Sequence, residues 1–232
     1  MSSPLPPITG ISSMATRQLL AELSSEFTRQ SGVPVQFESV GGVDAARRVQ
    51  AGEAFDLVVL ASDALEKLIA SGAVDGSTRR DLVHSGVAVA VRQGAPHPAL
   101  QSEQAVREAV LAAPTIGYST GPSGVAVVRL FERWGILPQI QDRLLQASPG
   151  IPVGSLVAQG KVALGFQQLS ELIHEPGIEV VGPLPASIQI TTTFSAALGV
   201  HATQVTAARA LLDHLSSVQS AEVKRRQGME PV

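Results

Sequence analysis

The sequence predicts an α/β protein whose chain forms two lobes. β-branched apolar runs alternate with segments of helical spacing, which is typical of helices packed on a largely parallel sheet. The chain has 232 residues and is 44% hydrophobic, enough for one sizeable core or two smaller ones. The short strands outnumber those of an ordinary sheet, and no linker divides the chain into consecutive domains. We therefore expect one lobe at 1–84 with 195–232 and another at 85–194, joined by two chain crossings.

The first part of the chain contains three strands, each followed by a helix. Ser12 and Ser13 stand at the N-cap position of the first helix, whose apolar residues keep helical spacing up to Gly32. A Gly41-Gly42 turn opens the second helix, and Ser62 is expected to cap the third. The expected strands are 8–11, 33–37 and 56–60, and the helices that follow them reach about residues 32, 51 and 71.

The rest of the chain continues this alternation. Residues 87–91 alternate cleanly, as a strand does. The turn from Ser119 to Gly124 separates a strand from a helix whose apolar face includes Phe131 and Trp134. The other expected elements are strands at 115–118, 162–166 and 178–181, a long extended run at 188–200, and helices at 103–112, after Gly150 as far as residue 159, and at 203–218.

The composition excludes several classes of function. There are 17 basic and 20 acidic residues, a net charge of −3, whereas a nucleic-acid binder normally has a basic excess and stacking aromatics. The chain has no Cys, which excludes thiolate–metal sites and a cysteine nucleophile. The His residues lack metal-ligand spacing, and no nucleotide-binding or serine-hydrolase motif is present. We expect no nucleic-acid partner, no metal and no cofactor.

The N-terminus bears on location. Residues 1–7 form neither a basic nor an apolar segment, and nothing approaches the roughly 18 apolar residues that a membrane span needs. We therefore expect no membrane span. If Met1 is the natural start, the protein is expected in the cytoplasm; if an export signal preceded it, in the periplasm.

Four strand-to-helix junctions share one design: small or hydroxyl-bearing residues follow a strand, and a helix begins directly after them. Helix N-termini present unpaired N–H groups and the positive end of the helix dipole, so they attract anions. Ligands of open α/β sheets collect at the carboxyl ends of strands. Each junction alone reads as an ordinary turn, but four together predict a small anion held between the lobes. The candidate junctions are Ser12-Ser13, Gly41-Gly42, the turn with Ser119, Ser123 and Gly124, and Gly150-Ile151.

Several segments also carry a family resemblance: 11–14, 46–52, 55–59, 122–124 and 162–166. In their order and spacing the chain resembles, over nearly its whole length, the periplasmic-binding-protein-like (type II) proteins related to the molybdate-binding component of bacterial ABC importers. The resemblance implies a two-lobed α/β fold with a ligand cleft between the lobes. In this family, backbone N–H groups and hydroxyls hold the oxyanion without a full positive charge.

The resemblance also implies roles for individual residues. Ser13 matches the first serine ligand, and Ser123 and Ile151 match backbone donors. Gly42 stands where the family has a second serine, and Gln168 where molybdate binders have a tyrosine hydroxyl. Both departures lose a hydroxyl, which argues against molybdate as the ligand.

Some relatives of this family resemble enzymes, and aconitate isomerase is similar to the molybdate binders. Because Gly42 and Gln168 depart from the family's pattern and residues 1–7 show no signal segment, we expect a cytoplasmic isomerase of a small organic polycarboxylate. A proton shift of that kind needs donors that stabilise an enolate and a base that moves the proton. Glu38 follows the second strand, and Tyr118, the only Tyr, ends the strand before Ser119. These two are the expected catalytic residues, and His84 is a further candidate near a crossing.

The alternative is a substrate-binding protein of an ABC importer for molybdate, tungstate or another oxyanion. Its partner would be an ABC permease. The ligand domain of a transcription regulator shares the fold, but no helix-turn-helix segment precedes Ile8.

Overall fold

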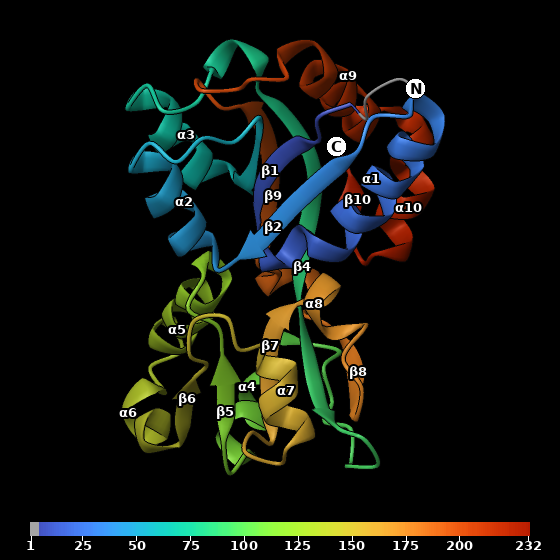
Figure 1. Cartoon of the computed structure of the whole chain (residues 1–232). Coiled ribbons are helices and arrows are strands. Elements are labelled where there is room, and N and C mark those ends of the chain that lie inside the picture. The colour runs from blue at the N-terminus through green and yellow to red at the C-terminus, as the bar shows by residue number, and fades with distance from the viewer. Residues whose placement is uncertain (1–4) are drawn as a thin grey trace. The chain divides into compact units, whose positions relative to one another are not determined.

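The computed structural model describes residues 5–232, which form two compact units (Figure 1). Unit 1 contains residues 5–84 and 193–232, and unit 2 contains residues 85–192. Each unit is a sheet covered by helices, so the expected α/β class is confirmed. Within residues 5–232, no helix has the length and apolar character needed to cross a membrane.

The sheet of unit 1 has the strand order β2-β1-β3-β9-β4, with β10 also paired to β4. The pairs β1–β2 and β1–β3 are parallel, whereas β9 runs antiparallel to β3. The sheet is therefore mixed rather than largely parallel, because the chain returns to it from unit 2 in the opposite direction. Its strands are β1 (Ile8–Ser13), β2 (Val35–Val40), β3 (Leu57–Ala61), β4 (Arg80–Arg92), β9 (Thr191–Leu198) and β10 (Glu230–Pro231).

Helices bury both faces of this sheet. Alternate residues of β3 point to opposite faces: Leu57 and Val59 join one apolar cluster and Val58 and Leu60 another. The first cluster lies under α1, α9 and α10, and the second under α2 and α3 (Figure 1). Both faces need apolar residues, which is why β3 reads as a continuous apolar run. The helices are α1 (Arg17–Ser31), α2 (Gly42–Gln50), α3 (Ser62–Ala70), α9 (Val205–Ser216) and α10 (Ala221–Arg226).

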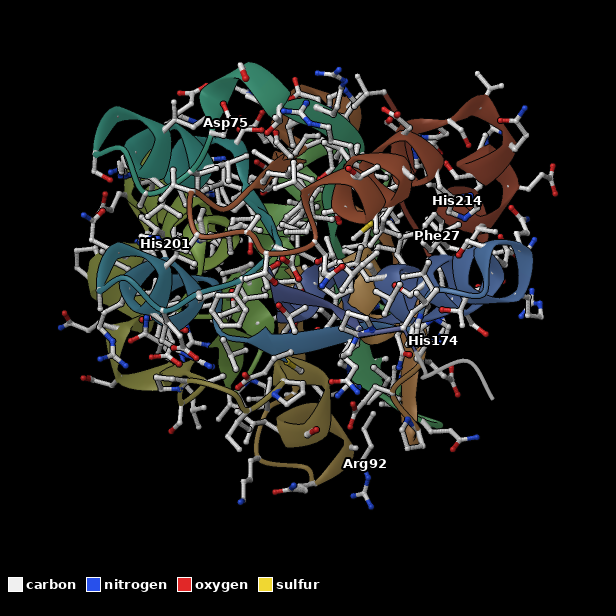
Figure 2. The ribbon with its side chains drawn as sticks, turned by 45° about the horizontal axis from the view of Figure 1, so that its top comes forward. Phe27, Asp75, Arg92, His174, His201 and His214 are labelled. Atoms are coloured by element: carbon white, nitrogen blue, oxygen red, sulfur yellow. The ribbon has the colours of Figure 1, made fainter. Side chains whose placement is uncertain are left out.

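Two contacts hold α9 in place. Phe27 of α1 packs against His214 of α9, with ring centroids 5.7 Å apart (Figure 2). Asp56, directly before β3, is 2% exposed. It accepts hydrogen bonds from the N–H groups of Thr9 (2.8 Å), Thr203 (2.7 Å) and Gln204 (2.9 Å). Burial opposes ionisation of Asp56, but these N–H groups outweigh it and lower the pKa of its carboxyl.

The sheet of unit 2 has the order β8-β4-β7-β5-β6. β5 is parallel to β6 and β7, and β4 is antiparallel to β7 and β8. On β4, Val87 and Val89 face the cluster of α4, α5 and α6, whereas Ala88 and Ala90 face α8. The new strands are β5 (Ile116–Tyr118), β6 (Leu144–Gln146), β7 (Leu164–Gln168) and β8 (Ile178–Pro183), and the helices are α4 (Glu103–Ala112), α5 (Pro122–Arg133), α6 (Leu137–Ile140), α7 (Val153–Ala158) and α8 (Leu169–Leu172).

Candidate functional site

Three parallel strands of unit 1 end at one edge of its sheet. Ser12 of β1 lies opposite Ser39 of β2 and Val59 of β3. A 3₁₀ turn and α1 follow β1, α2 follows β2, and α3 follows β3. The carboxyl ends of these strands and the N-terminal ends of the following helices thus meet at the edge where open α/β sheets bind ligands.

Ser13 has a hydroxyl that unit 1 leaves without a partner. The residue is 7% exposed, and its Oγ forms no hydrogen bond with any described residue. Gly42 begins α2 beside it, since a Cβ built on Gly42 would lie 3.5 Å from the Ser13 Cβ. The first intrahelical donor of α2 is the N–H of Ala45, so the N–H groups before it lack intrahelical partners. Ser13 and the start of α2 therefore form a set of uncharged donors suited to an anion.

Ser12 and Gly41 are already engaged at the same edge. Ser12 is fully buried, and its Oγ lies 2.8 Å from Ser39 Oγ and donates to the carbonyl of Ser13 at 3.3 Å. Gly41 is the N-cap of α2, and its carbonyl accepts from Ala45 N–H at 2.9 Å. A ligand bound through Ser12 would replace an existing hydrogen bond, whereas a ligand bound through Ser13 would not.

Glu38 is paired with a cation. The guanidinium of Arg48 donates to both carboxylate oxygens of Glu38, at 2.5 and 2.8 Å, and also to Glu53. Arg48 lies over the ring of Phe55, 5.5 Å from its centroid. The hydrogen bonds from Arg48 lower the pKa of the Glu38 carboxyl. A carboxylate stabilised in this way is a weaker proton acceptor.

Unit 2 has a second edge where parallel strands end. Tyr118 of β5 lies opposite Gln146 of β6 and Phe166 of β7. The helix α5 begins after the next turn, and its first intrahelical donor is Val125 N–H, so the N–H groups of Ser123 and Gly124 are free of intrahelical bonds. Tyr118 itself is half buried against the core of unit 2.

The turn before α5 depends on glycine. A Cβ built on Gly124 would lie 1.8 Å from the carbonyl oxygen of Ser119, a distance that no side chain tolerates. Ser123 is 6% exposed, and its Oγ lies 3.4 Å from Ser119 Oγ. Gly124 thus lets α5 begin directly against Ser119 and places two hydroxyls beside the free N–H groups.

The other two expected ligand residues of unit 2 already have hydrogen-bond partners. The N–H of Ile151 donates to the carbonyl of Ser148 at 2.9 Å. Gln168 is 3% exposed, and its amide fits best with nitrogen donating to Ser85 Oγ (2.8 Å) and oxygen accepting from Thr192 Oγ1 (2.9 Å). Both stay candidate ligand residues, but a ligand must displace a protein partner to reach either one.

Gln167, near the end of β7, is a buried polar residue that the sequence did not single out. It is 3% exposed, its Oε1 accepts from Gly154 N–H at the start of α7 (3.2 Å), and its Nε2 donates to Glu171 (2.7 Å). The sequence held one indication of this second polar contact. Successive residues of a strand point to opposite faces of the sheet, so Gln167 and Gln168 cannot share one set of partners.

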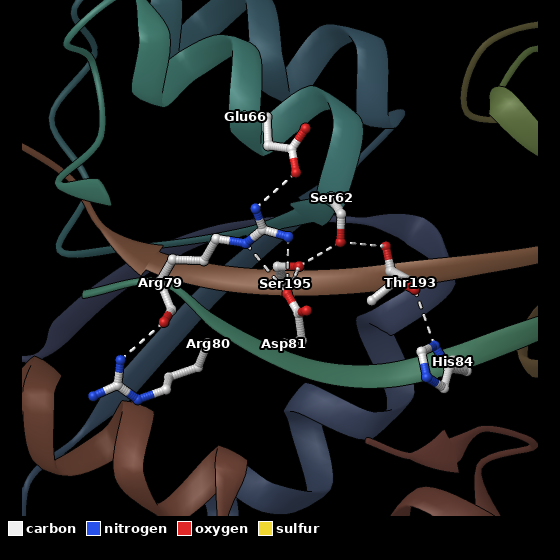
Figure 3. Close-up of polar contacts among 8 residues, drawn as sticks. All are labelled: Ser62, Glu66, Arg79, Arg80, Asp81, His84, Thr193 and Ser195. Atoms are coloured by element: carbon white, nitrogen blue, oxygen red, sulfur yellow. Dashed lines mark hydrogen bonds and ion pairs between the residues drawn. The ribbon is translucent and has the colours of Figure 1, made fainter. Parts of the chain in front are cut away.

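The expected cap at Ser62 is wrong. Ser62 is the first residue of α3 and makes no capping bond. Its Oγ lies 3.2 Å from the carbonyl oxygen of Thr193 and 2.5 Å from Ser195 Oγ, and Ser195 Oγ donates to Asp81 at 2.6 Å (Figure 3). Two of these partners follow Ser62 by more than a hundred residues, so no local pattern could reveal the contact.

Each unit thus presents uncharged donors at helix starts, a type of site that attracts small anions. Residues 8–230 match the family model of bacterial extracellular solute-binding proteins, and the chain belongs to this family. It is 35% identical to an aconitate isomerase from a Pseudomonas species, over all of this chain and 90% of that protein. It is 20% identical to the molybdate-binding protein of Escherichia coli K12, over 95% of this chain and 88% of that protein.

The solved structures agree on the fold. The periplasmic molybdate-binding protein of Azotobacter vinelandii matches with a TM-score of 0.80 at 19% identity, over 96% of this chain and 98% of that one. This likeness confirms the expected periplasmic-binding-protein fold class.

Proposed function

We propose that this protein binds a small organic polycarboxylate and isomerises it by a proton shift. The observation that carries the proposal is the buried, unpartnered hydroxyl of Ser13 beside the start of α2. A hydroxyl without a partner is costly to bury unless a ligand uses it. Unit 2 has donors of the same chemical type at the start of α5, and these suit a carboxylate as well.

Two features support an organic ligand. Gly42 leaves open space at the start of α2, since a Cβ there would meet only Ser13 within 4 Å; this room suits a ligand larger than a tetrahedral oxyanion. The 35% identity to the aconitate isomerase also exceeds the 20% identity to the molybdate-binding protein.

The chemistry follows from these donors. Removing a proton next to a carboxylate places negative charge on the carboxylate oxygens, and N–H donors fixed at helix starts stabilise that charge without reorganising. A base then returns the proton to another carbon of the same ligand. Each unit has donors of this type at a helix start, and Tyr118 and Glu38 are the candidates for moving the proton.

Turnover is tested directly with trans-aconitate. Proton NMR of trans-aconitate with the purified protein in D₂O should show cis-aconitate forming and deuterium entering the ligand. Binding of trans-aconitate with neither change would contradict the isomerase and leave a polycarboxylate-binding protein.

Substitution of Ser13 separates stability from binding. We expect Ser13→Ala to raise the unfolding midpoint of the ligand-free protein slightly, because an unsatisfied buried hydroxyl costs about 1 kcal/mol. The same variant should lose most of the midpoint shift that trans-aconitate causes. Ser24 is the matched control, since its Oγ in α1 is likewise buried without a partner. Ser24→Ala should also stabilise the protein but keep the full ligand shift; equal loss in both variants would refute the role of Ser13.

Two substitutions compare the candidate proton-transfer residues. Because Arg48 lowers the pKa of Glu38, we expect Tyr118→Phe to reduce turnover more, by about a hundredfold. Glu38→Gln should reduce turnover less and leave ligand affinity unchanged. If Glu38→Gln abolishes turnover while Tyr118→Phe is active, Glu38 is the base.

The alternative function is the substrate-binding protein of an ABC importer for molybdate, tungstate or another oxyanion. The family match and the likeness to molybdate-binding structures favour it. An importer component should bind its oxyanion without changing it and should function with a permease.

A further inference from the structure

The Ser62 hydroxyl donates its hydrogen bond to another residue of unit 1. Asp81 carries a carboxylate, which only accepts hydrogen bonds, so Ser195 donates to it at 2.6 Å. Ser195 Oγ then accepts from Ser62 at 2.5 Å (Figure 3). If Ser62 donated instead to the carbonyl of Thr193 at 3.2 Å, its proton would still remain within the unit. In either arrangement, Ser62 offers a ligand lone pairs only.

Ser62 lies at the sheet edge of unit 1 where β1, β2 and β3 end, and it is partly exposed. It follows β3 directly, and β3 is parallel to β1, whose last residue is Ser13. Ser13 has a buried hydroxyl without a partner, which is free to donate. Neighbouring strand ends therefore present one hydrogen-bond donor and one hydrogen-bond acceptor. A fully ionised oxyanion matches the donor but is repelled by the acceptor.

We propose that Ser62 accepts a hydrogen bond from a protonated carboxyl group of the bound polycarboxylate, so that the ligand takes up a proton when it binds. This inference rests on the proposed function, because it requires a carboxylate ligand. One proton from solvent forms an O–H bond on one ligand oxygen, and no other bond changes. The chain of hydrogen bonds then runs from the protonated ligand oxygen through Ser62 and Ser195 to the carboxylate of Asp81, which stays ionised.

The proton uptake would assist the proposed chemistry. A protonated carboxyl group draws electrons more strongly than a carboxylate, so the neighbouring C–H bond is more acidic. The enolate that forms carries less charge for the helix-start donors to stabilise. Ser62 is thus a positioning residue that sets the protonation state of the ligand.

Other charged groups surround the chain of hydrogen bonds. Arg79 pairs with Asp81 at 3.1 Å and with Glu66 of α3 at 2.7 Å. His84, further along β4, lies with its Nδ1 2.9 Å from Thr193 Oγ1. The imidazole of His84 can also bind a proton, so His84 must be excluded as the site of proton uptake.

Calorimetry measures the proton directly. Titration of trans-aconitate into the protein, at a slightly alkaline pH in buffers of different ionisation enthalpy, gives the number of protons taken up per ligand. We expect about one for the natural sequence and about zero for Ser62→Ala and Asp81→Asn. Ser62→Ala should also weaken binding about tenfold. Ser25→Ala, at an exposed position of α1, and His84→Gln should both keep the uptake.

The outcomes separate this inference from the proposed function. Binding of trans-aconitate without proton uptake would overturn the role of Ser62 and leave the proposed function standing. Uptake that survives Ser62→Ala but disappears in His84→Gln would overturn it as well. If trans-aconitate does not bind the natural protein, the proposed function itself fails.

Discussion

Asp56→Ala should lower the free energy of unfolding by about 3 kcal/mol and the midpoint by roughly 10 °C. The substitution leaves the N–H groups of Thr9, Thr203 and Gln204 without their buried acceptor. It thereby detaches the start of α9 from β1 and β3. Thermal and urea unfolding measure the loss, and Asp213→Ala, at an exposed position of α9, should change the midpoint little.

The dependence of stability on acid pH tests the role of Asp56 a second time. The folded structure lowers the pKa of Asp56, so its contribution is full above the unfolded-state pKa of about 3.9. The contribution is lost as the pH falls through the lower, folded-state pKa. Asp56→Ala should lack this part of the acid dependence. An unchanged acid profile, or a midpoint loss no greater than that of Asp213→Ala, would contradict the anchoring role.

Gly124→Ala should have the largest effect on the ligand site. The new Cβ would meet the carbonyl oxygen of Ser119 at 1.8 Å, so either the turn or the start of α5 must move. We expect a stability loss of about 2 kcal/mol and a loss of ligand affinity of at least about tenfold, since the free N–H groups and Ser123 move with the helix.

The matched control lies in the same turn. A Cβ on Gly121 would meet only Ser119 Oγ, at 3.9 Å, and the backbone there has φ −76°. Gly121→Ala should therefore keep both stability and affinity. Equal effects of the two substitutions would show that any change in this turn is harmful and that the close approach at Gly124 has no special role.

The fold was predictable to the extent that it depends on local patterns. The helix at 103–112 is observed as expected, with Ser102 as its cap, because a cap and an apolar stripe both lie within the segment. The extended run expected at 188–200 contains the strand β9 (Thr191–Leu198), but its first residue, Ile188, ends a 3₁₀ turn, because apolar residues alone do not mark where pairing begins. The short strand β6 contains too few residues to show a period.

The candidate site was less predictable, because hydrogen-bond partners come from distant segments. Ser13 and Gly42 could be selected as helix-start residues, but the sequence could not tell that Ser12 is engaged by Ser39 and Ser13 is not. Nor could it pair Glu38 with Arg48 or Ser62 with Ser195. Those contacts depend on which strands are neighbours, which no single segment records.

The central claim is that the ligand is a polycarboxylate. Thermal unfolding should be measured with trans-aconitate, cis-aconitate, citrate, molybdate, tungstate and sulfate, because a ligand of the native state at a hundredfold excess over its Kd adds about 2.7 kcal/mol. We expect the tricarboxylates alone to raise the midpoint. A shift with the metal oxyanions and none with the tricarboxylates would contradict the claim and identify an oxyanion-binding protein instead.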